Sequence, residues 1–189
     1  MSPAVAALLG AAAGAMAALV GSIITNLVTV RNERLRHEKA EHAAYIAALR
    51  EQAAGVFSAM FAIQHAINWV TWFAKNDPSE LDEARIRSYD DEVHAAMPKC
   101  LGLMTMVASL NLKVYEEIQA TCEVIYELDR RVASALHNLG ADREKALREL
   151  RDHWEHVVEI EYTLPRQVAH VMNIAEADRP DFKQRARST

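Results

Sequence analysis

The chain has 189 residues, of which 51% are hydrophobic, and its 21 Lys and Arg against 26 Asp and Glu give a formal net charge of −5. Only six glycines and five prolines accompany abundant Ala, Leu, Glu and Arg, a composition that favours helices and offers little material for sheet turns. Two cysteines, Cys100 and Cys122, lack paired metal-ligand spacing and fit a reducing compartment, so we expect buried thiols.

The charge is unevenly distributed along the chain. Residues 1–39 and 178–189 each carry a net charge of +2, whereas residues 40–177 carry 13 basic and 22 acidic side chains, a net charge of −9. An acidic body argues against a nucleic-acid groove, so no nucleic-acid partner is expected. The two basic ends suit an anionic membrane surface instead.

The first predicted element is the uncharged stretch from Pro3 to Val30. As a helix it would be roughly 42 Å long, more than the hydrocarbon core of about 30 Å. A cleaved signal peptide is the alternative, but such peptides begin with positive charge, and here no Lys or Arg precedes Arg31. We therefore expect residues 1–30 to form a single transmembrane anchor.

Basic residues follow this span directly. Short basic flanks stay on the cytoplasmic side of a membrane, which places the N-terminus outside and the body of the protein in the cytoplasm. The residues expected at the lipid surface here are Arg31, Arg34, Arg36 and Lys39.

Small residues recur at every fourth position of the span. The stripe consists of Ala6, Gly10, Gly14, Ala18 and Ser22. Small residues at this spacing let two helix backbones approach closely in lipid, which predicts a homodimer through this face. The alternative explanation is composition, because Ala and Gly are so frequent here that such pairs arise by chance.

Residues 31–52 are predicted to be a polar juxtamembrane helix that continues from the bilayer, and residues 53–177 to be a helical bundle. From Ala53 onward, apolar residues recur at helical spacing as the core face of a long helix. These residues are Val56, Phe57, Met60, Phe61, Ile63, Ile67, Val70 and Phe73.

A second transmembrane span is the rival interpretation of Ala53–Ala74, because this segment also lacks formal charge and carries Trp69 and Trp72 near one end. Its second half contains three polar side chains that are costly in lipid, which disfavours the rival. They are Gln64, His65 and Asn68.

A second helix is predicted to begin at Pro78, with Asp77 as its cap and Glu80 completing a capping box. Pro98 is expected to kink or break it. The expected core residues on the two sides of this proline are Leu81, Tyr89, Val93, Met97, Cys100, Leu101, Met104, Val107 and Leu110.

A third helix, capped by Ser109 or Asn111, should run to about Asn138 with a core face close to a coiled-coil heptad register. Gly140 is then expected to stop that helix and Asp142 to cap a fourth, kinked at Pro165. The core face of the third helix is Leu112, Tyr115, Ile118, Cys122, Ile125, Val132 and Leu136, and that of the fourth is Leu147, Leu150, Trp154, Val157, Ile160, Leu164, Val168, Val171 and Ile174.

The short links force sequential helices to lie antiparallel, so the predicted fold is all-α: the anchor continues into the first helix of an antiparallel four-helix cytoplasmic bundle. Cys100 and Cys122 each lie eleven residues from Asn111 and should be neighbours. Trp154 should pack against Ile125. Residues 178–189 are predicted to be a disordered basic tail whose cations reach the lipid headgroups, namely Arg179, Lys183, Arg185 and Arg187.

The layout resembles a group of uncharacterised bacterial single-span membrane proteins with a helical cytoplasmic domain. The resemblance rests on the basic stretch Arg31–Lys39, on Ala44-Tyr45 and on the break at Ser109–Val114. It implies an N-terminal span, a basic juxtamembrane stretch and a helical cytoplasmic body, and it implies no activity.

Histidine supplies the main candidate chemistry. His153 and His156 are three residues apart and, with Glu149, offer nitrogen and oxygen ligands to a metal such as zinc. The di-iron signature Glu-x-x-His is absent, and so is His-Glu-x-x-His, so a solvated charged face is the competing explanation. A phosphate loop and a nucleophile elbow are absent as well, and neither an enzyme nor a cofactor is expected.

The predicted function is that of a membrane-anchored scaffold, adaptor or regulator that acts through contacts with an unknown protein partner. A metal- or ligand-binding sensor that uses His153 and His156 is one alternative. A membrane-perturbing effector in which Ala53–Ala74 also inserts is the other.

Overall fold

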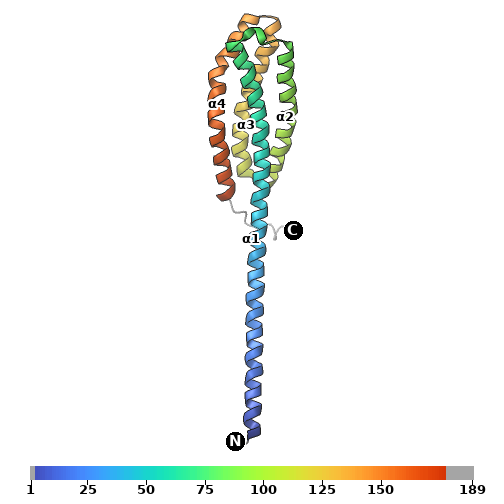
Figure 1. Ribbon diagram of the computed structural model, residues 1–189, viewed down its shortest axis with the longest axis vertical. Helices are drawn as coiled ribbons and strands as arrows, with labels where there is room; N and C mark the ends of the chain where they lie inside the picture. Colours follow the sequence, from blue (N-terminus) through green and yellow to red (C-terminus); the bar gives the residue numbers. More distant parts are fainter. Residues whose placement is uncertain (1–2, 178–189) are drawn as a thin grey trace. The chain divides into compact units, whose positions relative to one another are not determined.

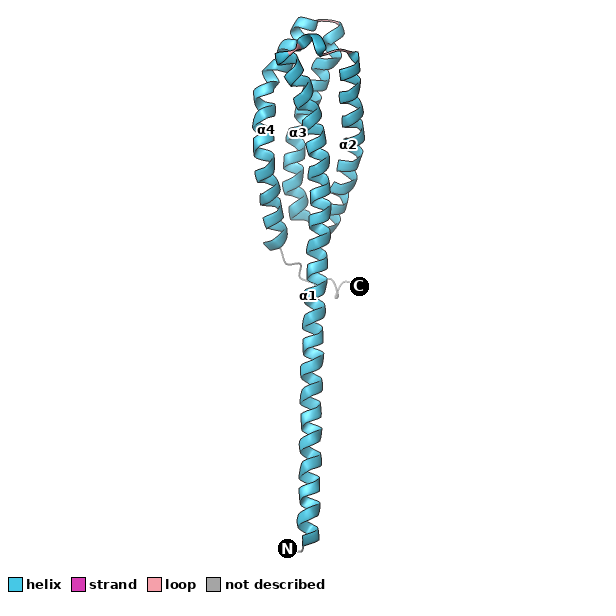
Figure 2. Ribbon diagram, in the orientation of Figure 1, coloured by secondary structure: helices cyan, strands magenta, loops and turns pink. Residues whose placement is uncertain are grey.

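The computed structural model describes the backbone of residues 3–177 and the side chains of Met16 and residues 18–175. Within that range the chain is all-helical and contains no strand, which confirms the predicted class (Figure 2). The four long helices are α1 (Pro3–Asn76), α2 (Glu83–Leu110), α3 (Leu112–His137) and α4 (Arg143–Ala177).

The chain divides into two compact units, residues 1–45 and residues 46–189, and α1 contributes to both. In the first unit, α1 has no other helix beside it, and the described apolar side chains there are exposed to 45–70%. They are Met16, Leu19, Val20, Ile23, Ile24, Leu27, Val28, Val30 and Leu35. A helix with so much uncovered apolar surface requires lipid or a protein to cover it.

Two of the described helices are long and apolar enough to cross a membrane. They are α1 and α2, and their most apolar windows have the same mean hydropathy of 1.3.

Of the small-residue stripe, Ala18 and Ser22 are exposed, whereas Ala6, Gly10 and Gly14 lie outside the described side chains.

In the second unit the four helices lie alongside one another in a bundle-like arrangement (Figure 1). Side-chain contacts join each helix to the next. Tyr89 of α2 donates to Asp129 of α3, and His170 of α4 pairs with Glu117 of α3. Gln64 of α1 donates to the Val157 carbonyl of α4 at 2.9 Å.

Gly55 marks a close approach of α1 to α2. A Cβ atom added there would lie 3.0 Å from Cδ1 of Leu103, closer than nearly all real Cβ contacts. The absence of a side chain at Gly55 therefore leaves the space that the Leu103 side chain occupies.

The core draws on all four helices and largely follows the predicted faces. Met60, Ile118 and Leu150 are fully buried. The prediction of a core position is wrong for three residues, because Phe61, Leu101 and Leu112 are exposed by 40%, 51% and 61%. Phe61 and Leu101 each follow a buried residue directly, and one step along a helix turns the side chain by about 100°, out of the buried arc.

The start of the second helix differs from the prediction. Pro78–Glu80 forms a short 3₁₀ turn, and α2 begins only at Glu83. Asp82, which the sequence pattern did not single out, is the residue that caps α2. Its carboxylate accepts a hydrogen bond from the backbone N–H of Arg85 at 2.9 Å.

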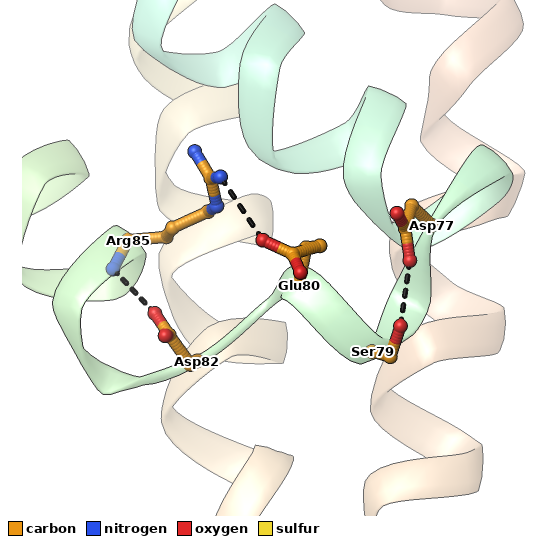
Figure 3. Close-up of polar contacts among 5 residues, drawn as sticks. All are labelled: Asp77, Ser79, Glu80, Asp82 and Arg85. Carbon is orange, nitrogen blue, oxygen red and sulfur yellow. Dashed lines mark hydrogen bonds and ion pairs between the residues drawn. The ribbon is translucent and has the colours of Figure 1, made fainter.

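Figure 3 shows why Asp77 and Glu80 do not form the predicted capping box. Asp77 accepts a hydrogen bond from the Ser79 hydroxyl at 2.6 Å, so its carboxylate serves the turn. Glu80 points to the Arg85 guanidinium, with which it forms an ion pair at 3.2 Å. Both carboxylates thus hold the turn between α1 and α2 and do not cap a helix.

The remaining turns follow the predicted chemistry in part. Asn111 caps α3, since its side chain accepts from the Val114 N–H at 3.1 Å, and Asp142 accepts from the Lys145 N–H at 3.0 Å. Gly140 does not adopt the left-handed conformation of a C-terminal stop but belongs to a 3₁₀ turn, Asn138–Gly140. Pro98 and Pro165 lie inside helices that continue through them, so of the two outcomes predicted at Pro98, a kink or a break, the break does not occur.

Replacing Asn111 by Ala is expected to lower the free energy of unfolding by about 1–2 kcal/mol, because a cap side chain that is 6% exposed leaves a helix N–H unpaired when it is removed. Chemical denaturation followed by circular dichroism measures this loss. Ser109→Ala is the control, since the Ser109 hydroxyl is exposed and bonds only within its own turn, to the Met106 carbonyl. Equal losses for the two variants would contradict the capping role.

The prediction that the two cysteines are neighbours is confirmed. Cys100 and Cys122 are free, buried thiols that lie next to each other. The predicted pairing of Trp154 with Ile125 is wrong. Ile125 shares a surface depression with Ile160 and Leu164, about two turns further along α4, while Trp154 is only half-buried and lies against α1.

Candidate functional site: an aromatic groove

Aromatic side chains of α1 and α4 line a surface groove in the second unit. We call it the aromatic groove, and its lining residues are His65, Asn68, Trp69, Trp72, Trp154 and Glu161. The lining residues of α1 are three or four positions apart in the sequence, so their side chains form one stripe along the helix. That stripe lies next to the buried face of α1 and not on it, since Trp69 and Trp72 are exposed by 47% and 39%.

Ring contacts fix the aromatic side chains. Trp69 meets Trp72 edge to face, with ring centroids 6.0 Å apart, and stacks on Phe73 at 5.5 Å. The indole N–H of Trp69 donates to Nε2 of His65 at 2.8 Å, so this imidazole nitrogen carries no proton. The groove is therefore a fixed surface with large apolar area.

Charged groups surround the aromatic rings. Lys75 lies over the Trp154 ring at 5.4 Å from its centroid, and Glu161 accepts a hydrogen bond from the Asn68 amide at 3.0 Å. Arg151 of α4 donates to the carbonyl of Ala74 in the last turn of α1, which ties the two walls together.

Two amide oxygens beside the groove lack a donor. Gln64 Oε1 and Asn68 Oδ1 are buried and have no hydrogen-bond partner, although the amide nitrogens of both side chains donate to α4. Buried acceptors without partners cost free energy, and they are the groups that a ligand or a water molecule satisfies. Of the two, only Asn68 lines the groove, which therefore combines aromatic faces with one unpaired acceptor.

The histidine cluster on α4 does not assemble as a ligand set. His156 pairs with Glu159 at 3.7 Å, and Glu149 faces Lys145 at 4.0 Å. Burial, aided by the charge of Arg131, lowers the pKa of His153. Among the side chains that the structure describes, no group of three or more His, Cys, Asp and Glu is arranged to hold a metal.

A separate buried polar pair lies between α2 and α3. The Tyr89 hydroxyl donates to Oδ1 of Asp129 at 2.5 Å, and burial together with this hydrogen bond raises the pKa of Tyr89. Burial also raises the pKa of Asp129, and the charge of Asp90 adds to that effect. The Tyr89 hydrogen bond and His94 oppose it without cancelling it.

This pair predicts a pH dependence of stability. A carboxyl with a raised pKa in the folded state contributes stability below its unfolded pKa and loses it as the pH rises through the folded value. Asp129→Asn cannot ionise, so the variant should lose less stability than the wild type between pH 4 and pH 7. Urea unfolding at several pH values in this range measures the difference, and parallel pH profiles would show that Asp129 is not the group concerned.

The predicted membrane-surface residues fall into two groups. Arg31, Arg34, Arg36 and Lys39 are exposed on α1, and Arg34 forms an ion pair with Glu38 at 3.1 Å. The basic residues of the tail, Arg179, Lys183, Arg185 and Arg187, lie outside the described residues.

Sequence reasoning singled out Gln64, His65, Asn68 and the two tryptophans of α1 as evidence about a second span. Glu161 and Lys75 were missed. The available signal was Gln64, a polar residue within the predicted core face. It is 3% exposed, and such a residue requires a partner on another helix.

The sequence matches no family model, and comparisons with curated proteins and with solved structures found no match. The groove and the distribution of charge and apolar surface are therefore the features that indicate a function.

Proposed function

We propose that the chain is a single-pass membrane protein whose helical cytoplasmic part binds another protein through the aromatic groove. The observation that carries the proposal is the exposure of Trp69 and Trp72 next to Trp154 and the unpaired amide oxygen of Asn68. Tryptophan clusters of this kind are enriched at the centres of protein interfaces, where they supply most of the binding energy.

The architecture proposed for the binding part is an antiparallel four-helix bundle. Its support is the pairing of early residues of one helix with late residues of the next. Tyr89 contacts Asp129, Cys100 contacts Cys122, and Glu117 contacts His170. Such pairs are expected when sequential helices run in opposite directions.

The proposed anchor is residues 1–30, with the N-terminus outside and the rest of the chain cytoplasmic. Exposed apolar side chains such as Ile23 and Leu27 support it, and so does the basic segment that follows. The segment at 53–74 is instead assigned to the bundle, because its apolar face is buried among the other helices. Self-association through the stripe from Ala6 to Ser22 stays a prediction.

The groove favours a partner segment with a basic side chain. Its aromatic faces attract cations, Glu161 supplies a carboxylate, and the unpaired oxygen of Asn68 lies beside them. The surrounding body of the chain is acidic, with a net charge of −9 over residues 40–177, which favours association with a basic surface.

Photocrosslinking in intact membranes tests this proposal. A benzophenone amino acid replaces Trp72, or as a matched control Leu101, an apolar α2 residue with 51% exposure that does not line the groove. The expected result is a discrete crosslinked species at position 72 that Glu161→Ala weakens and that is absent at position 101. Identical patterns at the two positions, or no product at position 72, would overturn the groove as the contact surface.

A further inference from the structure

Four sulfur atoms meet in the core of the second unit, away from the aromatic groove. The Cys122 thiol lies 3.4 Å from the Met60 sulfur and 3.5 Å from the Met104 sulfur, and the buried Cys100 is its neighbour on α2. The sulfur atoms come from three helices: Met60 from α1, Cys100 and Met104 from α2, and Cys122 from α3. We call these four residues the sulfur cluster.

The two sulfur–sulfur separations from Cys122 are close to those of a tetrahedral metal site. Metal–sulfur bonds of about 2.3 Å hold the sulfur atoms of a tetrahedron roughly 3.8 Å apart. The observed separations of 3.4 Å and 3.5 Å are a few tenths of an ångström shorter. Methionine side chains are unbranched and flexible, so a small outward shift of Met60 and Met104 accommodates an ion.

The ligand chemistry selects among metals. Thiolate and thioether sulfur are soft ligands that favour Cu(I), whereas zinc sites use Cys, His and carboxylate ligands and no thioether. No carboxylate or imidazole of the described residues joins the cluster to make a site of three or more such groups. Cys100 and Cys122 are at most 1% exposed, and a soft monovalent ion suits this dry environment better than a hard divalent one.

Charge balance also fits one monovalent ion. Cys100 and Cys122 are both free and buried, and binding of Cu(I) to one of them as a thiolate releases a single proton. One thiolate and one monovalent cation give a neutral buried site.

Tyr126 lies between the cluster and the surface. Its hydroxyl is buried and has no hydrogen-bond partner among the described residues, while its side chain lines a surface depression with Glu123, Glu127 and Arg130.

We propose that Met60, Cys100, Met104 and Cys122 form a binding site for one Cu(I) ion. Binding releases one thiol proton to solvent as the Cu(I)–thiolate bond forms, and the copper stays in its reduced state throughout. Cys100 and Cys122 supply the thiolate and the thiol, and Met60 and Met104 supply thioethers. The site joins α1, α2 and α3, so the bound ion stabilises their packing.

The test titrates the purified full chain in detergent with Cu(I) under anaerobic, reducing conditions against a colorimetric Cu(I) chelator. The expected result is one Cu(I) per chain and X-ray absorption that shows only sulfur ligands at about 2.3 Å. Thermal unfolding should also shift upward on loading, because the ion binds the folded state. Failure of the wild-type chain to retain Cu(I) against the chelator would overturn the proposal.

Variants assign the ligands. The double variant Met60→Leu with Met104→Leu conserves volume, so the fold should persist while the Cu(I) affinity falls. Loss of a group that only supports a metal ligand costs about 10- to 100-fold in affinity, and loss of these two ligands should cost at least as much. Cys100→Ser with Cys122→Ser should abolish binding. Met106→Leu is the matched control, since Met106 is 55% exposed, and it should bind as the wild type does. Unchanged affinity in either double variant would exclude the sulfur cluster as the site.

Discussion

Deletion of residues 1–30 is expected to move the protein from the membrane pellet to the soluble fraction. The deleted stretch carries no charge, and its described apolar side chains are more than half exposed, so lipid is the environment that stabilises them. In the proposed anchor each central Leu, Ile or Val contributes about 0.3–0.6 kcal/mol to insertion, and we expect their sum to hold the chain in the bilayer. Membrane fractionation with alkaline carbonate extraction measures the change.

The same experiment separates one span from two. Deletion of residues 178–189 serves as the control and should leave the protein in the carbonate-resistant pellet. If the chain without residues 1–30 also stays in that pellet, then α2 or the 53–74 segment of α1 inserts, since both α1 and α2 are apolar enough to do so.

A Leu150→Ala substitution is expected to lower the free energy of unfolding by about 2–5 kcal/mol. Leu150 of α4 is fully buried, so the truncated side chain leaves a cavity that its neighbours fill only in part. In a chain of this size each kcal/mol corresponds to roughly 2–4 °C in Tm. Thermal unfolding in mild detergent, followed by circular dichroism, records the shift.

Leu101→Ala is the informative comparison for this loss, because the sequence pattern places Leu101 in the core and the structure leaves it 51% exposed. A change within about 0.5 kcal/mol is expected there. A loss as large as that of Leu150→Ala would mean that Leu101 packs against something, and the pattern-based assignment would then be right after all.

Helix identity and most of the core could be predicted from the sequence because apolar spacing directly reports which face a helix buries. Asn111 and Asp142 were also predictable, since a cap uses a side chain and a backbone N–H only three residues apart. The start of α2 was not predictable. Asp77 and Glu80 have the spacing of a capping box. In the structure Glu80 instead pairs with Arg85, and the turn extends to Asp82, which caps α2.

The groove and the sulfur cluster were harder to predict for a different reason. Both bring together residues that are far apart in the sequence and lie on different helices. No local pattern predicts which of these residues meet. The proximity of Cys100 and Cys122 was predictable because the two residues are equally far from Asn111 in the sequence. The position of Trp154 was not, because the register of α4 against α3 is offset by about two turns from the one that simple counting from Gly140 gives.

The hydrogen bond from Gln64 to the Val157 carbonyl joins residues that lie 93 positions apart. Ribosomes add about 5–20 residues each second, so α1 waits roughly 5–20 s for its partner on α4 during synthesis. Throughout that interval the apolar face of α1 has no α4 to cover it, and the nascent chain is exposed to aggregation and proteolysis. Translation that stops before residue 157 therefore releases a tethered fragment with an uncovered helix face, which quality-control proteases can recognise.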